Sequence, residues 1–249
     1  MEAPEDFDLD NKYDPQNPNY ISPITTIDSG PSEGEIITTS EAIFSWSGND
    51  EIMEFRVHHN NILLSDWSGS TSYKLDYLDE GNHTFSVQGR YSNLDTSLTV
   101  NKNFIVDAVK GPSLIFSPRR QSANLGQSLA FEIIAEEVSD VTGTEFVILF
   151  DNTILNIDSI NVGSMFTLDQ DYIFDKKIDN TKGSAKLLIG ILGGTELGFT
   201  GTGALAKIYM TKKISTETTA IFDGSETFRG PTNNEIQINT TIGGLIINQ

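Results

Sequence analysis

The stretch GTEFVILFDNTILNIDSINVGSMF, residues 143–166, decides the fold. It opens with two alternating sets of side chains, Phe146, Ile148 and Phe150 in one and Glu145, Val147 and Leu149 in the other. Strict alternation with β-branched and aromatic residues predicts a strand with one buried face. The other face is unusual, because Val147 and Leu149 take positions that a half-solvated strand gives to polar residues. Such a strand is either covered on both sides or presents an apolar surface to a partner.

The composition limits the class of protein. With 249 residues the chain can form one large or two ordinary domains. It has 16 Lys+Arg against 35 Asp+Glu, a formal net charge of −19, so we exclude nucleic acid and anionic membrane surfaces as partners. It has no cysteine, which removes disulfides and cysteine-based zinc sites. No apolar run is long enough to form a transmembrane segment.

Helix signals are weak along the whole chain. Short alternating runs rich in Thr and Ile are separated by Gly, Asn and Asp, which predicts an all-β protein. An acidic surface without cysteine is typical of an exported bacterial protein. The sequence carries no signal peptide, and we expect that an export signal has been removed.

Residues 1–30 are rich in Pro, Asp and Asn and show no period, which predicts an acidic tether. Four of its acids have the spacing of a helix–loop–helix calcium loop, namely Asp6, Asp8, Asp10 and Asp14. Asn11 and Asn17 replace the glycine and the glutamate of such a loop, so we favour a plain linker and predict no metal or other cofactor. The run NKYDPQNPNYI resembles the tether of mature bacterial lipoproteins, which implies a lipid anchor, although the lipidated cysteine is absent.

Residues 31–108 contain short alternating runs such as AIFSWSG, MEFRVHH and HTFSVQGRY, which predict a small β-sandwich. At FSWSGND and LDEGNHTFSV this segment resembles bacterial immunoglobulin-like or fibronectin type III-like modules. By that resemblance His83 is the corner aromatic that hydrogen-bonds back to the chain. His58 and His59 are adjacent in a predicted strand and should point to opposite faces, so we expect loose strand histidines and no shared metal.

A Gly-Pro break at residues 109–112 predicts a domain boundary, and residues 113–249 form the second domain. Eight or more strands follow, with turns predicted at Gly126, Asn152, residues 180–183 and Gly243-Gly244. That number of strands favours a two-sheet sandwich of the jelly-roll type.

This half resembles cohesin modules in an ordered set of segments. The set comprises Gly126 before LAFEII, Gly143 before FVILFD with Asp151 closing it, Leu155, GSMF, DNTKGSAKLLIGIL, GTGALAKIYM and the terminal IGGLIIN. The resemblance implies a nine-stranded jelly roll whose partner is a dockerin-containing protein, with the calcium carried by the dockerin.

Catalysis has little support in the sequence. Acid pairs such as Asp169 with Asp171, or Glu136 with Glu137, could serve glycoside hydrolysis, but 35 acidic residues make such pairs unavoidable. The run GTGALA at residues 201–206 looks like a dinucleotide fingerprint, yet the alternation in ALAKIYM predicts a strand instead of the required helix. We predict that the chain is not an enzyme.

The resemblance places the partner-binding residues on the outward faces of two strands, at Glu145, Val147, Leu149, Lys186, Leu188 and Gly190. The alternative is that this surface packs against the first domain or a loop of its own domain. Family members often carry Asn or Asp near the start of the first strand, where this chain has Gly143 and Thr144, so the choice of dockerin is not predicted.

Three functions are consistent with these patterns. The first is a secreted or cell-surface scaffold module that docks a dockerin-bearing protein, linked to polysaccharide degradation. The second is a carbohydrate-binding sandwich with polysaccharide as ligand, although Trp46 and Trp67, the two tryptophans, both lie in the first domain. The third is a structural adhesin or spacer without a specific ligand.

Overall fold

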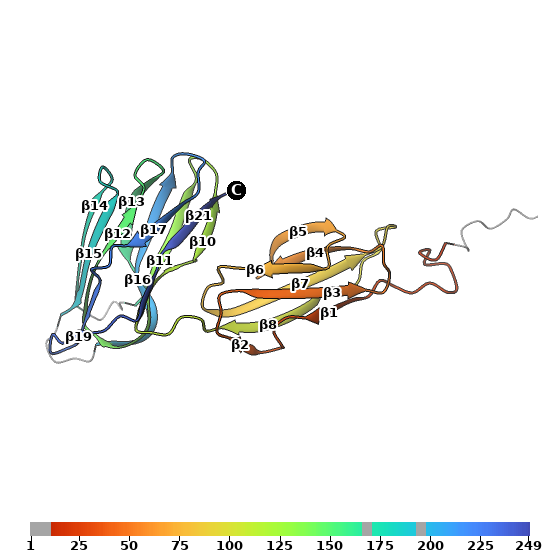
Figure 1. The fold of residues 1–249 in the computed structure, drawn as a ribbon, viewed down its shortest axis with the longest axis horizontal. Helices are drawn as coiled ribbons and strands as arrows, with labels where there is room; N and C mark the ends of the chain where they lie inside the picture. The colour runs from red at the N-terminus through yellow and green to blue at the C-terminus, as the bar shows by residue number, and fades with distance from the viewer. Residues whose placement is uncertain (1–10, 166–170, 193–197) are drawn as a thin grey trace, which may run out of the picture. The chain divides into compact units, whose positions relative to one another are not determined.

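The computed structural model describes residues 11–165, 171–192 and 198–249, which form 21 β-strands and, within those ranges, no helix (Figure 1). The chain divides into two compact units, Met1–Ala108 and Val109–Gln249. Each unit consists of two sheets with a buried apolar core. The predicted fold class, all-β with two sandwiches, is confirmed. These ranges contain no helix long and apolar enough to cross a membrane.

The first unit combines a three-stranded and a five-stranded sheet. The smaller sheet has the order β1 (Thr25–Ser29), β3 (Ala42–Gly48) and β6 (Ser72–Leu75). The larger has the order β2 (Glu35–Ile37), β8 (Val100–Val106), β7 (Gly81–Arg90), β4 (Glu54–His59) and β5 (Ile62–Ser68). The core is aromatic: Phe44 stacks on Phe85 with ring centroids 3.9 Å apart, and Trp46 is 2% exposed.

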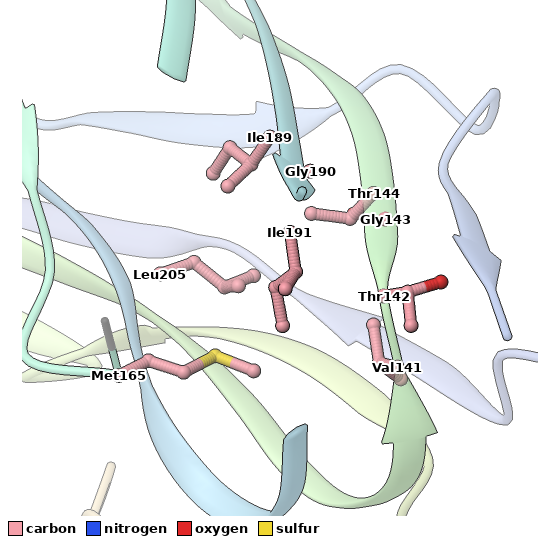
Figure 2. Close-up of a pocket in the computed structure, with 9 residues that line it drawn as sticks. All are labelled: Val141, Thr142, Gly143, Thr144, Met165, Ile189, Gly190, Ile191 and Leu205. Atoms are coloured by element: carbon pink, nitrogen blue, oxygen red, sulfur yellow. The ribbon is translucent and has the colours of Figure 1, made fainter. Parts of the chain in front are cut away.

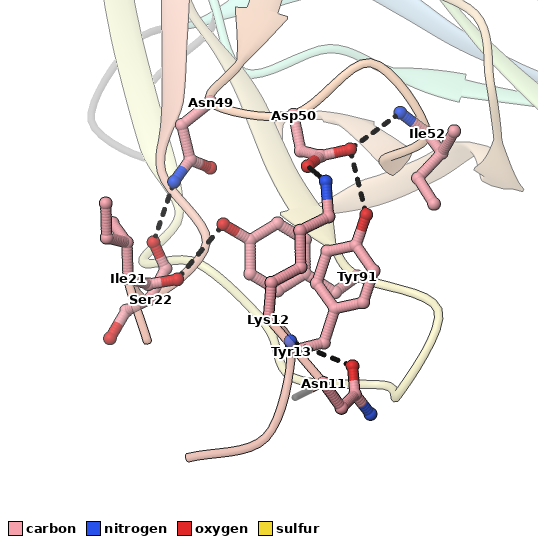
Figure 3. Close-up of polar contacts among 9 residues, drawn as sticks. All are labelled: Asn11, Lys12, Tyr13, Ile21, Ser22, Asn49, Asp50, Ile52 and Tyr91. Atoms are coloured by element: carbon pink, nitrogen blue, oxygen red, sulfur yellow. Dashed lines mark hydrogen bonds and ion pairs between the residues drawn. The ribbon is translucent and has the colours of Figure 1, made fainter. Parts of the chain in front are cut away.

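Part of the segment predicted to be a tether belongs to the first unit instead. β1 pairs with β3, and the Tyr13 ring packs against Tyr91 with centroids 4.9 Å apart. Asp50 accepts hydrogen bonds from the Tyr13 hydroxyl at 3.1 Å and from Lys12 Nζ at 2.6 Å (Figure 3). The prediction failed here because isolated tyrosines in a Pro- and Asn-rich run show no period.

The acids with the spacing of a calcium loop lie mostly outside the described residues, which do not include Asp6, Asp8 and Asp10. Asp14 Oδ1 accepts a hydrogen bond from the backbone N–H of Gln16 at 2.8 Å. Asp14 therefore closes a local turn of the kind that Asp and Asn side chains commonly make.

His83 contacts the backbone as expected, with Nε2 2.9 Å from Asp79 O. Its Nδ1 lies 2.8 Å from Nε2 of His59, and the two rings stack with centroids 5.0 Å apart. The interpretation of His59 as a loose strand histidine was therefore wrong, because β4 and β7 are neighbours in the sheet. Burial first, and the nearby His83 second, lower the pKa of His59 from 6.5 to about 4.

We expect the first unit to lose stability as the pH falls from 6.5 toward 4. In that window unfolded His59, with a pKa of 6.5, takes up a proton that folded His59, with a pKa of about 4, does not. Urea unfolding followed by tryptophan fluorescence measures this unit alone, since both tryptophans lie in it. His59→Gln should lose less stability over the same window, and equal losses in the two proteins would contradict this account.

The second unit is built of a larger and a smaller sheet. The larger has the order β10 (Arg120–Ala123), β21 (Gly244–Asn248), β17 (Thr218–Phe222), β12 (Gly143–Phe150), β15 (Ser184–Ile191) and β14 (Tyr172–Asp179), with β18 (Thr227–Arg229) beside β12 and β19 (Glu235–Ile236) beside β18. The smaller has the order β13 (Leu155–Val162), β16 (Phe199–Lys212), β11 (Ser128–Val141), β9 (Ser113–Ser117) and β20 (Thr240–Ile242). Buried side chains of both sheets, including Phe131, Phe146 and Leu187, form one core.

Most of the local predictions for this unit hold. Turns occur at Gly126, Asn152 and residues 180–183, and the run GTGALA lies within β16. The turn predicted at Gly243-Gly244 was wrong, because Gly243 links β20 of one sheet to β21 of the other. The unit has more strands than the nine expected when its shortest segments are included. These segments of two or three residues were not predicted, because they are too short to show alternation.

Lys212 ties the ends of three strands together. Its side chain is fully buried at the end of β16, and Nζ donates to Ala123 O at 3.3 Å, Ile247 O at 2.9 Å and Asn248 Oδ1 at 2.7 Å. A buried ammonium group must be satisfied by such contacts, because its desolvation is costly. The contacts join β16 to the ends of β10 and β21.

Replacing this lysine should therefore destabilise the second unit. Lys212→Met keeps the apolar stem but leaves three oxygens without their donor, and we expect a loss of about 2–4 kcal/mol in the free energy of unfolding. Differential scanning calorimetry measures the effect. The matched control is Lys207→Met, which removes only a half-exposed lysine 3.7 Å from Glu132 and should cost less than about 1 kcal/mol. Equal effects would contradict the proposed role of Lys212.

Candidate docking face

The pairing of β12 with β15 places the six predicted binding residues on one face. The strands are antiparallel, with Glu145 opposite Leu188 and Val147 opposite Lys186. The alternate residues of both strands enter the core, and none is more than 7% exposed, namely Phe146, Ile148, Phe150, Ala185, Leu187 and Ile189. The period of two therefore directs all six predicted residues outward.

Two neighbouring strands extend the apolar surface. Leu149 lies opposite Ile221 of β17, and Ile173 of β14 is diagonal to Leu188. Together with Val147, these four residues form an apolar stripe that runs diagonally across four strands. Ile173 and Ile221 were missed in the sequence, because nothing in it shows that β14 and β17 flank the central pair.

The apolar stripe is open to solvent. Ile173 and Ile221 are 44% and 47% exposed, and Leu149 and Leu188 are each 38% exposed. Described loops of the second unit therefore leave the stripe uncovered. These four exposed aliphatic side chains lie together in one stripe, whereas exposed apolar residues on most surfaces are scattered singly.

Charged groups border the apolar stripe. Lys186 Nζ lies 2.5 Å from Glu145 Oε1, and both side chains are about half exposed, at 52% and 42%. Asp175 and Lys177 of β14 lie opposite Leu188 and Lys186. The face thus combines an apolar centre with a rim of both charges, which is the usual anatomy of a protein–protein interface.

A small cavity lies beneath one end of this face. It measures about 10 Å³, close to the volume that one water molecule needs, and its walls include Thr144, Met165, Ile191 and Leu205 (Figure 2). Thr144 Oγ1 is buried without a hydrogen-bond partner in the described part of the chain. The start of β12 is therefore packed less well than its end.

The tryptophans considered for glycan binding differ in exposure. Trp46 is buried in the first core. The Trp67 ring carries the guanidinium groups of Arg56 and Arg90, which lie 4.9 and 4.5 Å from its centroid. Trp46 therefore cannot stack on a sugar, and Trp67 is the tryptophan that is partly open to solvent.

The acids considered for glycoside hydrolysis make local hydrogen bonds where the structure describes them. Asp169 lies outside them, Glu136 Oε1 accepts a hydrogen bond from Thr202 at 2.9 Å, and Glu137 accepts one from the backbone N–H of Gly111 at 2.9 Å. The described ranges also contain no group of three His, Asp or Glu side chains placed to hold a metal ion.

Comparison with known proteins identifies a family. The family model described as Cohesin domain matches residues 116–247. No curated protein matches the chain.

Several solved cohesin structures are similar to part of this chain. The sixth cohesin of Acetivibrio cellulolyticus scaffoldin B, in complex with a mutant Cel5 dockerin, is 19% identical with a TM-score of 0.48, and the match covers 56% of this chain and 100% of that chain. The third cohesin of ScaC from the same organism, in complex with the ScaB dockerin, is 16% identical with a TM-score of 0.48, covering 55% and 97%. A non-cellulosomal cohesin from Archaeoglobus fulgidus is 16% identical with a TM-score of 0.42, covering 54% and 88%.

The exposed ion pair on this face should contribute little to folding. We expect the exchange Glu145→Lys with Lys186→Glu to change the free energy of unfolding by less than about 1 kcal/mol, since pairs of this exposure are strongly screened by solvent. Thermal unfolding followed by circular dichroism measures it. A larger loss would show that the pair supports the sheet and is not free to serve a partner.

Proposed function

The chain belongs to the cohesin family through residues 116–247, and from this premise we propose that its second unit docks a dockerin-containing protein on the outward face of β12 and β15. Cohesin domains are non-catalytic protein–protein interaction modules. The proposed contact residues are the six predicted ones, Glu145, Val147, Leu149, Lys186, Leu188 and Gly190, together with Ile173 and Ile221.

The single observation that supports this proposal most strongly is the uncovered apolar stripe. Its residues lie on a sheet whose other face is buried in the core. The strands therefore cannot rotate to bury the stripe. Covering apolar surface gains about 25 cal/mol per Å² before the costs of association are subtracted. The mixed charges around the stripe would fix the orientation of the partner more than its affinity.

The rest of the chain fits the role of a support. We propose that the first unit, which resembles immunoglobulin-like or fibronectin type III-like modules, is a spacer between an N-terminal anchor and the docking unit. A secreted or cell-surface location, with lipid anchoring and a link to polysaccharide degradation, completes this proposal. The calcium of the complex would belong to the dockerin, so this chain needs no metal of its own.

Titration calorimetry with recombinant dockerins from the same genome, in the presence of calcium, tests the proposal. We expect at least one dockerin to bind, and Leu188→Asp to weaken that binding by about thirtyfold or more, because it places a charge at the centre of the buried contact.

The matched control is Leu125→Asp, which changes another exposed leucine, 64% exposed, in the turn before β11. Its affinity should equal that of the natural chain. Unchanged binding by Leu188→Asp would remove the proposed face, and failure of every dockerin to bind would overturn the proposed partner.

A further inference from the structure

Two glycines face each other on the docking face. Gly143 of β12 lies directly opposite Gly190 of β15, and the row continues to Arg229 of β18 on one side and Ile173 of β14 on the other. The outward surface therefore consists of bare backbone at the centre of this row, next to the apolar stripe.

The fold does not require either glycine. A Cβ at Gly143 would come no closer than 3.7 Å to another atom and one at Gly190 no closer than 3.8 Å, which are ordinary contacts, and neither residue has a left-handed φ. At Gly163, by contrast, a Cβ would lie 2.1 Å from a backbone oxygen. A glycine inside a strand costs about 0.5–1 kcal/mol relative to alanine, so both residues lower stability without an internal reason.

The bare backbone forms one side of an open hollow of about 570 Å³. Residues 225–233 supply much of the remaining wall, and the walls include Leu188, Thr227, Arg229 and Pro231. A volume of this order is within the range of pockets that accept ligands. The hollow adjoins the apolar stripe through Leu188, which belongs to both.

The charges in the hollow indicate what it can accept. The positive charge of Arg229 would repel a cationic side chain. A carboxylate would meet Glu145 in the wall and Glu235, which already lies 3.8 Å from Arg229. A large uncharged side chain avoids both penalties, and an aromatic ring can lie flat on bare backbone with the guanidinium group against its face.

We propose that this hollow is a socket for one aromatic side chain of the docked partner, and that Gly143, Gly190 and Arg229 shape it. The inference rests on the proposed docking function and assigns the position that selects among partners. Buried aromatic anchors often dominate the binding energy of interfaces. A single socket for such an anchor can therefore determine which partner binds.

The first test fills the socket. Gly143→Ala and Gly190→Val should leave the melting temperature unchanged or raised, because both side chains fit the sheet. Both should weaken binding of the dockerin identified above, Gly190→Val by about tenfold or more. Gly69→Val is the matched control, since Gly69 also has open space and an ordinary φ but belongs to the first unit. It should bind normally.

The second test identifies the occupant. Each surface aromatic residue of that dockerin is replaced by alanine and titrated against the natural chain and against Gly190→Val. One replacement should weaken binding to the natural chain and have little further effect on Gly190→Val, as expected for two groups in direct contact.

The outcomes separate the two proposals. A dockerin that binds natural and glycine-substituted chains equally would overturn the socket and leave the docking function standing. If no aromatic replacement in the dockerin is coupled to Gly190→Val, the socket is also overturned. Absence of binding by every dockerin would overturn the docking function and this inference together.

Discussion

The pairing of β12 with β15 is the constraint on which the rest of the second unit depends. Because successive side chains alternate between faces, a shift of one residue in this register would expose Phe146 and Leu187 and bury Glu145 and Lys186. The apolar core therefore fixes the register, and the register in turn fixes the row of side chains that faces solvent. The docking face takes its rigidity from the core beneath it and needs no loop to hold its shape.

The fold could be predicted where strands are long and half buried. β3 and β12 alternate strictly, and both were found almost to the residue. β1 and β10 were missed, because both are short and their side chains show no clear period. β9 is buried at nearly every position and gives a short apolar run in place of alternation.

The candidate site was predictable to a similar degree and for the same reason. A period of two identifies which residues of one strand share a face, and the resemblance to cohesins assigned the outward sets of β12 and β15 to partner binding. It cannot show which strands are neighbours, and Ile221 joins the stripe only because β17 crosses back to lie beside β12. It assigned Gly190 to the outward face, but it could not show that Gly143 lies directly opposite.

Several departures from close packing lie near the start of β12. The unpartnered hydroxyl of Thr144, the cavity beside it and the two glycines that the backbone does not need all occur within the first two residues of that strand and their neighbours on β15. The end of the strand, at Ile148 and Phe150, is packed in the ordinary way. Local departures from good packing are expected where binding, and not folding, determines the residues.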